Sequence, residues 1–139
     1  MSAAHSFDEM TLFEPLYNGE DILNGKHANT TIPKIIGAIN RYTVTGEEYY
    51  LQVAANFWQI VVENHTYITG GNSEWEHFGE PKILDAERTS CNCETCNTYK
   101  SAQLTQILTF AIIFIDEPSL ISFSKSAVTC KASILITVG

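Results

Sequence analysis

Residues 27–65 carry the pattern that most restricts how this chain can fold. In the segment HANTTIPKIIGAINRY, apolar side chains recur at intervals of three and four, which places them on one face of a helix. Pro33 suits the first turn of such a helix, where its missing N–H is harmless, and Thr31 is suited to the N-cap. The stripe consists of Ile32, Ile35, Ile36 and Ile39.

A second helix follows after a short connection. Thr45 and Glu48 have the spacing of a capping box, so we expect this helix to begin near Gly46. Its apolar face repeats with the same helical period. Because the connection is only a few residues long, the two helices should pack antiparallel as a hairpin. The apolar face consists of Leu51, Ala54, Ala55, Trp58, Val61 and Val62.

The rest of the chain is less regular. A short helix is expected around Asp8 to Leu16. Residues 66–90 break the helical period, and Gly70 and Gly71 within them signal a loop; a loop of about 25 residues in a compact domain is usually functional or disordered. The segment CETCNTYKSAQLTQILTFAIIFI predicts a helix of some twenty residues. The β-branched residues of 122–139 favour a strand.

Composition excludes some classes of partner. The net charge of −8 over 139 residues, without a cluster of Lys and Arg, argues against nucleic-acid binding. The N-terminus lacks the basic and apolar regions of a secretory signal, so a cytoplasmic location is the default expectation. The longest apolar run, residues 107–115, is too short to span a bilayer, and no membrane association is expected.

Three of the four cysteines lie within six residues. Cys91, Cys93 and Cys96 are clustered, and Cys130 stands alone. A disulfide framework usually spreads its cysteines along the chain, so the cluster favours metal binding or thiol chemistry. Unconnected thiols are the alternative.

Three blocks of the sequence resemble a known family. NGKHANTTIPKIIGAINRYTVTGEEYYLQVAANFW, TYITGGNSEWEHFGEP and CETCNTY are similar, in order and spacing, to blocks of the glycoside hydrolase family 127 / 146 beta-L-arabinofuranosidase catalytic domain. The resemblance covers about residues 20–100. It implies an all-α fold, an (α/α)6 barrel of repeated helical hairpins, of which residues 27–65 would form one unit.

The resemblance also implies a chemistry. Enzymes of this family release L-arabinofuranose from β-linked ends with retention, using a zinc-bound cysteine as nucleophile and a glutamate as acid–base. A zinc-bound thiol is deprotonated at neutral pH and is therefore ready to attack. The glutamate protonates the leaving oxygen and then deprotonates water. The implied partner is an arabinofuranoside carbohydrate.

Family roles can be assigned to individual residues here. Glu94 and Cys96 match the zinc ligands of a Glu-Thr-Cys motif. Glu76 matches the acid–base in a Glu-x-Phe pattern, with Glu80 as the alternative. His27 matches a histidine that lies near the sugar. Separately, Trp75 is a candidate for stacking on the sugar because it adjoins the acidic cluster.

The resemblance is incomplete. The family's remaining zinc ligands and nucleophile come from an adjacent Cys-Cys pair, which this sequence lacks. A dozen helices also need far more than 139 residues. We therefore expect part of an (α/α)6 barrel, a helical hairpin plus long loop, inactive as this chain. The expected division is an N-terminal segment (1–19), a partial catalytic domain (20–100) and an apolar, irregular or β-prone tail unrelated to the family (101–139).

Other interpretations compete at each site. A small zinc-binding interaction module using Cys91, Cys93 and Cys96 is the main alternative, and Cys130 would complete a four-thiolate site. The loop glutamates could be solvated surface charges. A third interpretation is a carbohydrate-binding remnant built on Trp75 and the acidic loop.

Overall fold

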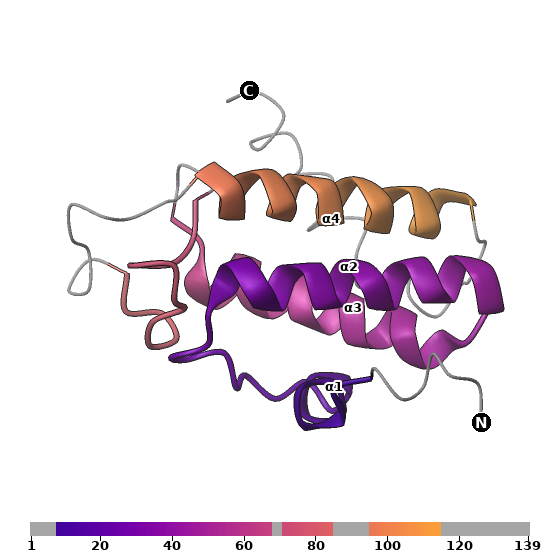
Figure 1. Ribbon diagram of the computed structural model, residues 1–139, viewed down its shortest axis with the longest axis horizontal. Coiled ribbons are helices and arrows are strands. Elements are labelled where there is room, and N and C mark those ends of the chain that lie inside the picture. The colour runs from indigo at the N-terminus through magenta and orange to yellow at the C-terminus, as the bar shows by residue number, and fades with distance from the viewer. Residues whose placement is uncertain (1–7, 68–70, 85–94, 115–139) are drawn as a thin grey trace.

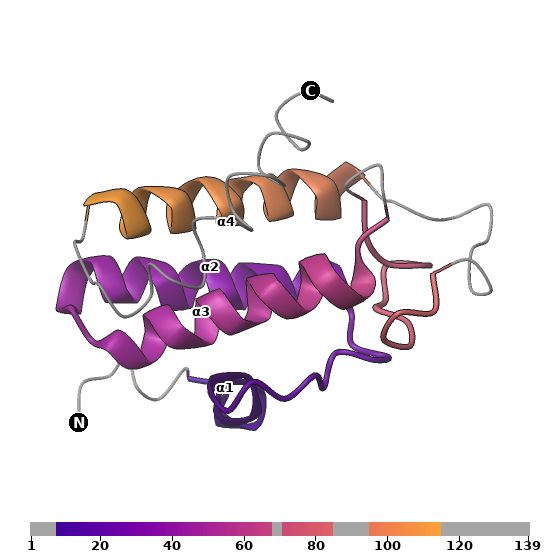
Figure 2. The same ribbon diagram turned by 180° about the vertical axis from the view of Figure 1, so that it is seen from behind.

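Four α-helices and one π-helical turn make up the regular structure of the part of the chain described here. The computed structural model describes residues 8–67, 71–84 and 95–114. The helices α2, α3 and α4 lie side by side, and α1 runs across them (Figures 1 and 2). Within the described residues there is no strand, only isolated β-bridges. The elements are α1 (Met10–Tyr17), α2 (Ala28–Thr45), α3 (Glu48–Ile60), η2 (Val61–His65) and α4 (Thr95–Phe114).

The hairpin predicted from the helical period is confirmed. α2 and α3 are antiparallel and pack along their length (Figure 1). Gly46 ends α2 with a left-handed φ of 72°, and its N–H donates to the Tyr42 carbonyl. Glycine adopts this conformation without a Cβ clash, which lets the chain reverse within two residues. The apolar stripe of α2 is buried, as expected; its buried members include Ile32, Ile35 and Ile39.

Both predicted N-caps are wrong. α2 begins at Ala28 with His27 as the N-cap, and the Thr31 hydroxyl donates to the His27 carbonyl from inside the helix. The Thr45 hydroxyl likewise donates to the Arg41 carbonyl, so no capping box forms with Glu48. In each case the threonine hydroxyl donates to the carbonyl four residues before it instead of capping a helix. Sequence spacing alone does not decide between these two hydrogen bonds.

The earlier start of α2 places Pro33 one full turn inside the helix. Pro33 has no N–H, so the Asn29 carbonyl loses its helical partner. The Lys100 ammonium of α4 donates to that carbonyl at 3.0 Å and also bonds the Asn29 side-chain oxygen. The carbonyl that Pro33 leaves without a helical partner in α2 therefore becomes the acceptor through which Lys100 holds α4 against α2.

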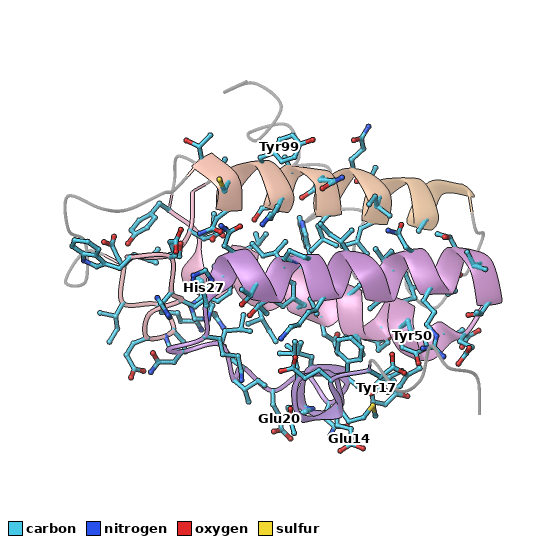
Figure 3. The ribbon with its side chains drawn as sticks, viewed as in Figure 1. Glu14, Tyr17, Glu20, His27, Tyr50 and Tyr99 are labelled. Carbon is cyan, nitrogen blue, oxygen red and sulfur yellow. The ribbon has the colours of Figure 1, made fainter. Side chains whose placement is uncertain are left out.

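α4 is the long helix predicted within residues 93–115, and it packs on α2. Leu104, Leu108 and Ala111 are buried, and the buried Trp58 indole N–H of α3 donates to the Thr105 hydroxyl at 2.9 Å. Tyr99 projects away from the bundle (Figure 3). None of the helices described here is long and apolar enough to cross a membrane.

α1 confirms the short helix expected near Asp8 to Leu16, and it packs against α3. Its start is held by a charged cluster. Arg41 donates to both Asp8 carboxylate oxygens at 3.0 Å, and the Tyr50 hydroxyl donates to Asp8 at 2.6 Å. Burial and this hydrogen bond to Asp8 raise the pKa of Tyr50 to about 12.

The all-α fold class is confirmed over the described residues, consistent with part of an (α/α)6 barrel. The strand predicted for 122–139 lies outside the described residues. The predicted domain boundary at residue 100 falls within the continuous helix α4, and the three-part division remains a prediction.

Candidate functional site

A tight turn at residues 74–77 presents the predicted acid. The N–H of Glu74 donates to the His77 carbonyl at 2.9 Å, and the N–H of His77 donates to the Glu74 carbonyl at 2.8 Å. The two central residues, Trp75 and Glu76, have φ values of 46° and 65°. Positive φ at both central positions is the pattern of a type I′ turn, which normally takes Gly, Asn or Asp. Holding two large residues there costs on the order of 1 kcal/mol each, and such strain concentrates at functional sites.

Backbone hydrogen bonds fix this turn to the start of α2. The N–H of Phe78 donates to the Lys26 carbonyl at 3.0 Å, and the N–H of Gly25 donates to the Phe78 carbonyl at 2.8 Å. The N–H of Ala28, the first residue of α2, donates to the Glu76 carbonyl at 2.7 Å. The Glu76 carbonyl thereby accepts from one of the N–H groups that the first turn of α2 leaves without a helical partner. Glu76 therefore lies at the N-terminus of α2.

The side chain of Glu76 contacts His27. Its Oε2 lies 2.9 Å from His27 Nε2, and both side chains are partly exposed. His27 Nδ1 is buried and has no hydrogen-bond partner among the described residues. A proton on Nδ1 would be a buried donor without an acceptor, so the favoured neutral tautomer carries its proton on Nε2 and donates it to Glu76. Glu76 Oε1 then remains available to a ligand.

Trp75 and His77 flank this pair. His77 Nδ1 lies 2.7 Å from the Trp75 carbonyl, to which it donates, and its ring stands edge-on to the His27 ring with centroids 4.9 Å apart. Trp75 is 65% exposed, although tryptophan normally buries much of its surface. An exposed indole beside a carboxylate is suited to stacking on the apolar face of a sugar ring.

Glu80, the alternative acid, lies elsewhere on the same loop. Its carboxylate accepts a hydrogen bond from the Asn24 amide at 2.6 Å. The structure therefore brings Glu76, rather than Glu80, beside His27. A cavity lined by Glu80, Glu74 and His65 has a volume of only about 10 Å³, room for at most one water. A sugar would have to contact the exposed side of the turn.

The loop is also bonded to α4. The buried Asn97 amide donates to the Ser73 hydroxyl at 2.8 Å, and the Asn72 amide donates to the Ser101 hydroxyl at 3.0 Å. Cys96, immediately before Asn97, is exposed in the first turn of α4. Figures 1 and 3 show that α2 and α4 begin at the same end of the bundle, where His27 lies. The acid loop and the thiol-bearing helix are thus directly connected.

The described residues do not fit a complete zinc site. Within them, no group of three His, Cys, Asp or Glu side chains is arranged to hold a metal ion. Cys96 supplies one soft ligand. The second predicted ligand, Glu94, and the neighbouring thiols Cys91 and Cys93 lie outside the described residues, as does Cys130.

A contact between a buried histidine and a carboxylate lies next to the residues that carry the acid turn. His65, at the end of η2, is buried and its Nε2 lies 3.0 Å from an oxygen of Asp21. Burial alone would raise the pKa of Asp21, but hydrogen bonds from Asn64, His65 and the N–H of Leu23, with the Coulombic effect of His65, hold that pKa below its usual value. The His65 ring also packs edge-on against Phe78, which follows the acid turn.

Sequence reasoning missed several of these positioning residues. Asp21 lies outside the segments that resemble the family and Asn72 and Asn97 lie inside them, but nothing local marks the partner of any of the three. Only Lys100 had a usable signal, because a proline inside a helix frees a carbonyl that needs a donor.

The site and fold together define a class of protein. It is a helical domain that presents a carboxylate (Glu76), a histidine (His27) and an exposed indole (Trp75) at the end of the bundle where α2 and α4 begin. Comparison with family models then identifies the family. Residues 1–111 match the model described as "Beta-L-arabinofuranosidase, GH127 catalytic domain", so the chain belongs to this glycoside hydrolase family. The match extends beyond residues 20–100 at both ends. A search of curated proteins found no match.

Proposed function

We propose that this chain forms the acid–base and sugar-contacting part of a retaining β-L-arabinofuranosidase domain. The observation that carries the proposal is the Glu76–His27 contact at 2.9 Å, displayed on a strained turn beside the exposed Trp75. Membership of a glycoside hydrolase family implies a carbohydrate substrate. The residues at this turn supply the two things that such a substrate needs, a proton donor and an aromatic face.

In this proposal each side chain has a defined task. Trp75 stacks on the sugar and orients its ring. Glu76 carries a proton on Oε1, gives it to the departing glycosidic oxygen, and later takes one from the attacking water. His27 donates from Nε2 to Oε2 throughout, which fixes the carboxyl plane and directs Oε1 outward.

We expect the 139-residue chain to bind an arabinofuranoside weakly and not to hydrolyse it. The nucleophile of the family belongs to an adjacent Cys-Cys pair, and this sequence contains no such pair. Without a nucleophile the acid–base can protonate the leaving group but no glycosyl–enzyme bond forms. Clear release of arabinose from a β-L-arabinofuranoside by the purified chain would contradict this expectation.

Zinc binding is part of the same proposal. Glu94 and Cys96 are assigned as two of its ligands, and zinc when bound would hold and deprotonate a thiol. Two ligands give weak and incomplete binding. Tight stoichiometric zinc that induces folding would instead favour the interaction module built on Cys91, Cys93 and Cys96.

The direct test is a titration of the chain with methyl β-L-arabinofuranoside, followed by NMR. The Trp75 indole N–H should shift and the buried Trp58 indole N–H should not, which makes Trp58 an internal control. Trp75→Ala should weaken the affinity by roughly fivefold or more, since an aromatic contact is worth about 1 kcal/mol. Equal shifts at both indoles, or an unchanged affinity in the variant, would argue against the site.

A further inference from the structure

Two reciprocal hydrogen bonds join the acid loop to α4. On the loop side Asn72 donates to Ser101 at 3.0 Å; on the helix side Asn97 donates to Ser73 at 2.8 Å. Each element thus offers one amide and one hydroxyl to the other. We call these four residues the Asn–Ser clamp.

The two amides of the clamp are buried, but each has a hydrogen-bond partner only for its nitrogen. Asn97 is 0% exposed and Asn72 is 1% exposed. The Oδ1 atom of each is buried and accepts no hydrogen bond from the described residues. A buried polar group with a missing partner costs about 1–3 kcal/mol, so an apolar pair of the same shape would serve stability at least as well. Stability alone therefore does not account for amides at these positions.

The position of the clamp suggests its purpose. Ser73 has a φ of 71° and lies three residues before Glu76, so three of the four residues from Ser73 to Glu76 are left-handed. Such conformations persist only where the surroundings hold them. On the other side, Asn97 directly follows Cys96 in the first turn of α4. The clamp connects the strained acid turn to the helix that carries the thiol.

We propose that Asn72 and Asn97 are positioning residues that hold the Glu76 turn in its strained form against α4, and so keep Glu76 in contact with His27. This rests on the proposed function of Glu76 as the acid–base. The backbone pairing with residues 25–28 fixes the turn to α2, and the clamp fixes it to α4. With the clamp removed, the left-handed residues relax and the carboxylate leaves His27.

The test separates positioning from stability by removing both partners of one bond. Asn97→Leu with Ser73→Ala keeps the shape of the larger side chain and deletes donor and acceptor together, which should leave the urea unfolding midpoint nearly unchanged. The matched control is Thr105→Val, which removes two other hydrogen bonds, from the Trp58 indole and to the Ser101 carbonyl, and leaves all four clamp side chains in place. That control should lower the midpoint without touching the turn.

Two readouts report on the turn in the full chain. Amide hydrogen exchange of His77, whose N–H donates to Glu74, should accelerate roughly tenfold in the double variant and not in Thr105→Val. The ring ¹⁵N signal of His27 Nε2 should move toward the value seen in Glu76→Gln, where the carboxylate charge is absent. An unchanged His77 exchange rate and an unchanged His27 signal in a folded double variant would overturn the proposal.

A milder pair guards against a variant that fails to fold. Ser101→Ala removes the acceptor of Asn72 at a partly exposed position, and Ser101→Thr retains a hydroxyl. The alanine variant should reproduce the faster exchange at His77 and the threonine variant should restore the original rate. Identical rates in the two would overturn the proposal. None of these readouts uses a sugar, so failure of sugar binding in the unmodified chain counts against the proposed function alone.

Discussion

Lys100 should be worth more to stability than a partly exposed lysine usually is. Surface ion pairs typically contribute less than about 1 kcal/mol. Lys100 instead donates to the Asn29 carbonyl, at 3.0 Å, and to the Asn29 side chain. A hydrogen bond from a charged donor contributes about 1.5–3 kcal/mol when buried. Because this site is part-buried, water can replace some of that loss. We therefore expect Lys100→Met to lower the free energy of unfolding by about 1–2 kcal/mol.

The same reasoning predicts a coupling with Pro33. In Pro33→Ala the new N–H reaches the Asn29 carbonyl and restores the helical hydrogen bond. Pro33 is exposed, so the substitution empties no core volume. We expect Pro33→Ala to stabilise the chain by about 1–2 kcal/mol, less than the roughly 3 kcal/mol typical of a helix interior because Lys100 already offsets part of the defect. In this background the cost of Lys100→Met should fall below about 1 kcal/mol.

The assay is urea unfolding followed by far-UV circular dichroism on the four members of the double-mutant cycle. Asn29→Ala is the control, since it removes the side-chain oxygen and leaves the carbonyl in place. If Lys100→Met costs the same in the unmodified chain as in the Pro33→Ala background, the freed carbonyl is not what Lys100 stabilises and the reasoning is wrong.

Three further predictions concern groups away from the turn. The folded pKa of Asp21 is depressed, so its contribution to stability is complete above about pH 4 and is lost as the pH falls through the folded pKa. The free energy of unfolding of Asp21→Asn, measured in urea, should therefore depend less on pH between about 5 and 3 than that of the unmodified chain. The folded pKa of Tyr50 is raised, so its hydrogen bond to Asp8 stabilises the fold below about pH 10 and is lost as the pH approaches about 12. In an ultraviolet titration, Tyr50→Phe should lack the phenol that ionises near that pH in the unmodified chain. Thr105→Val leaves the buried Trp58 N–H without an acceptor and should cost about 1–3 kcal/mol in urea unfolding, whereas Thr105→Ser should retain most of the stability.

The helices were predictable because their information is local. The isoleucine stripe of α2 and the apolar face of α3 follow the 3.6-residue period, and the hairpin follows from the short connection. Helix starts were less predictable. Thr31 and Thr45 have the spacing of caps, but both hydroxyls bond a carbonyl four residues back. Local side-chain hydrogen bonds compete too closely in energy for spacing to decide between them.

The candidate site was only partly predictable, because its geometry depends on contacts distant in sequence. The resemblance to the family singled out Glu76 and His27, and the structure places them in contact although 49 positions separate them. The left-handed turn at Trp75 and Glu76 has no sequence signal, since neither position is Gly, Asn or Asp. The clamp likewise joins polar residues whose partners no local pattern indicates. The roles of Glu76, Trp75 and Cys96 remain predictions.

The central claim is that the turn at residues 74–77 faces a sugar, with Glu76 as its proton donor. The most direct measurement is a crystal structure of the chain grown with methyl β-L-arabinofuranoside. We predict the ring against the Trp75 indole and the glycosidic oxygen within about 3 Å of Glu76 Oε1, while Oε2 stays bonded to His27. A sugar bound elsewhere on the bundle, with Trp75 and Glu76 in contact only with solvent, would contradict it.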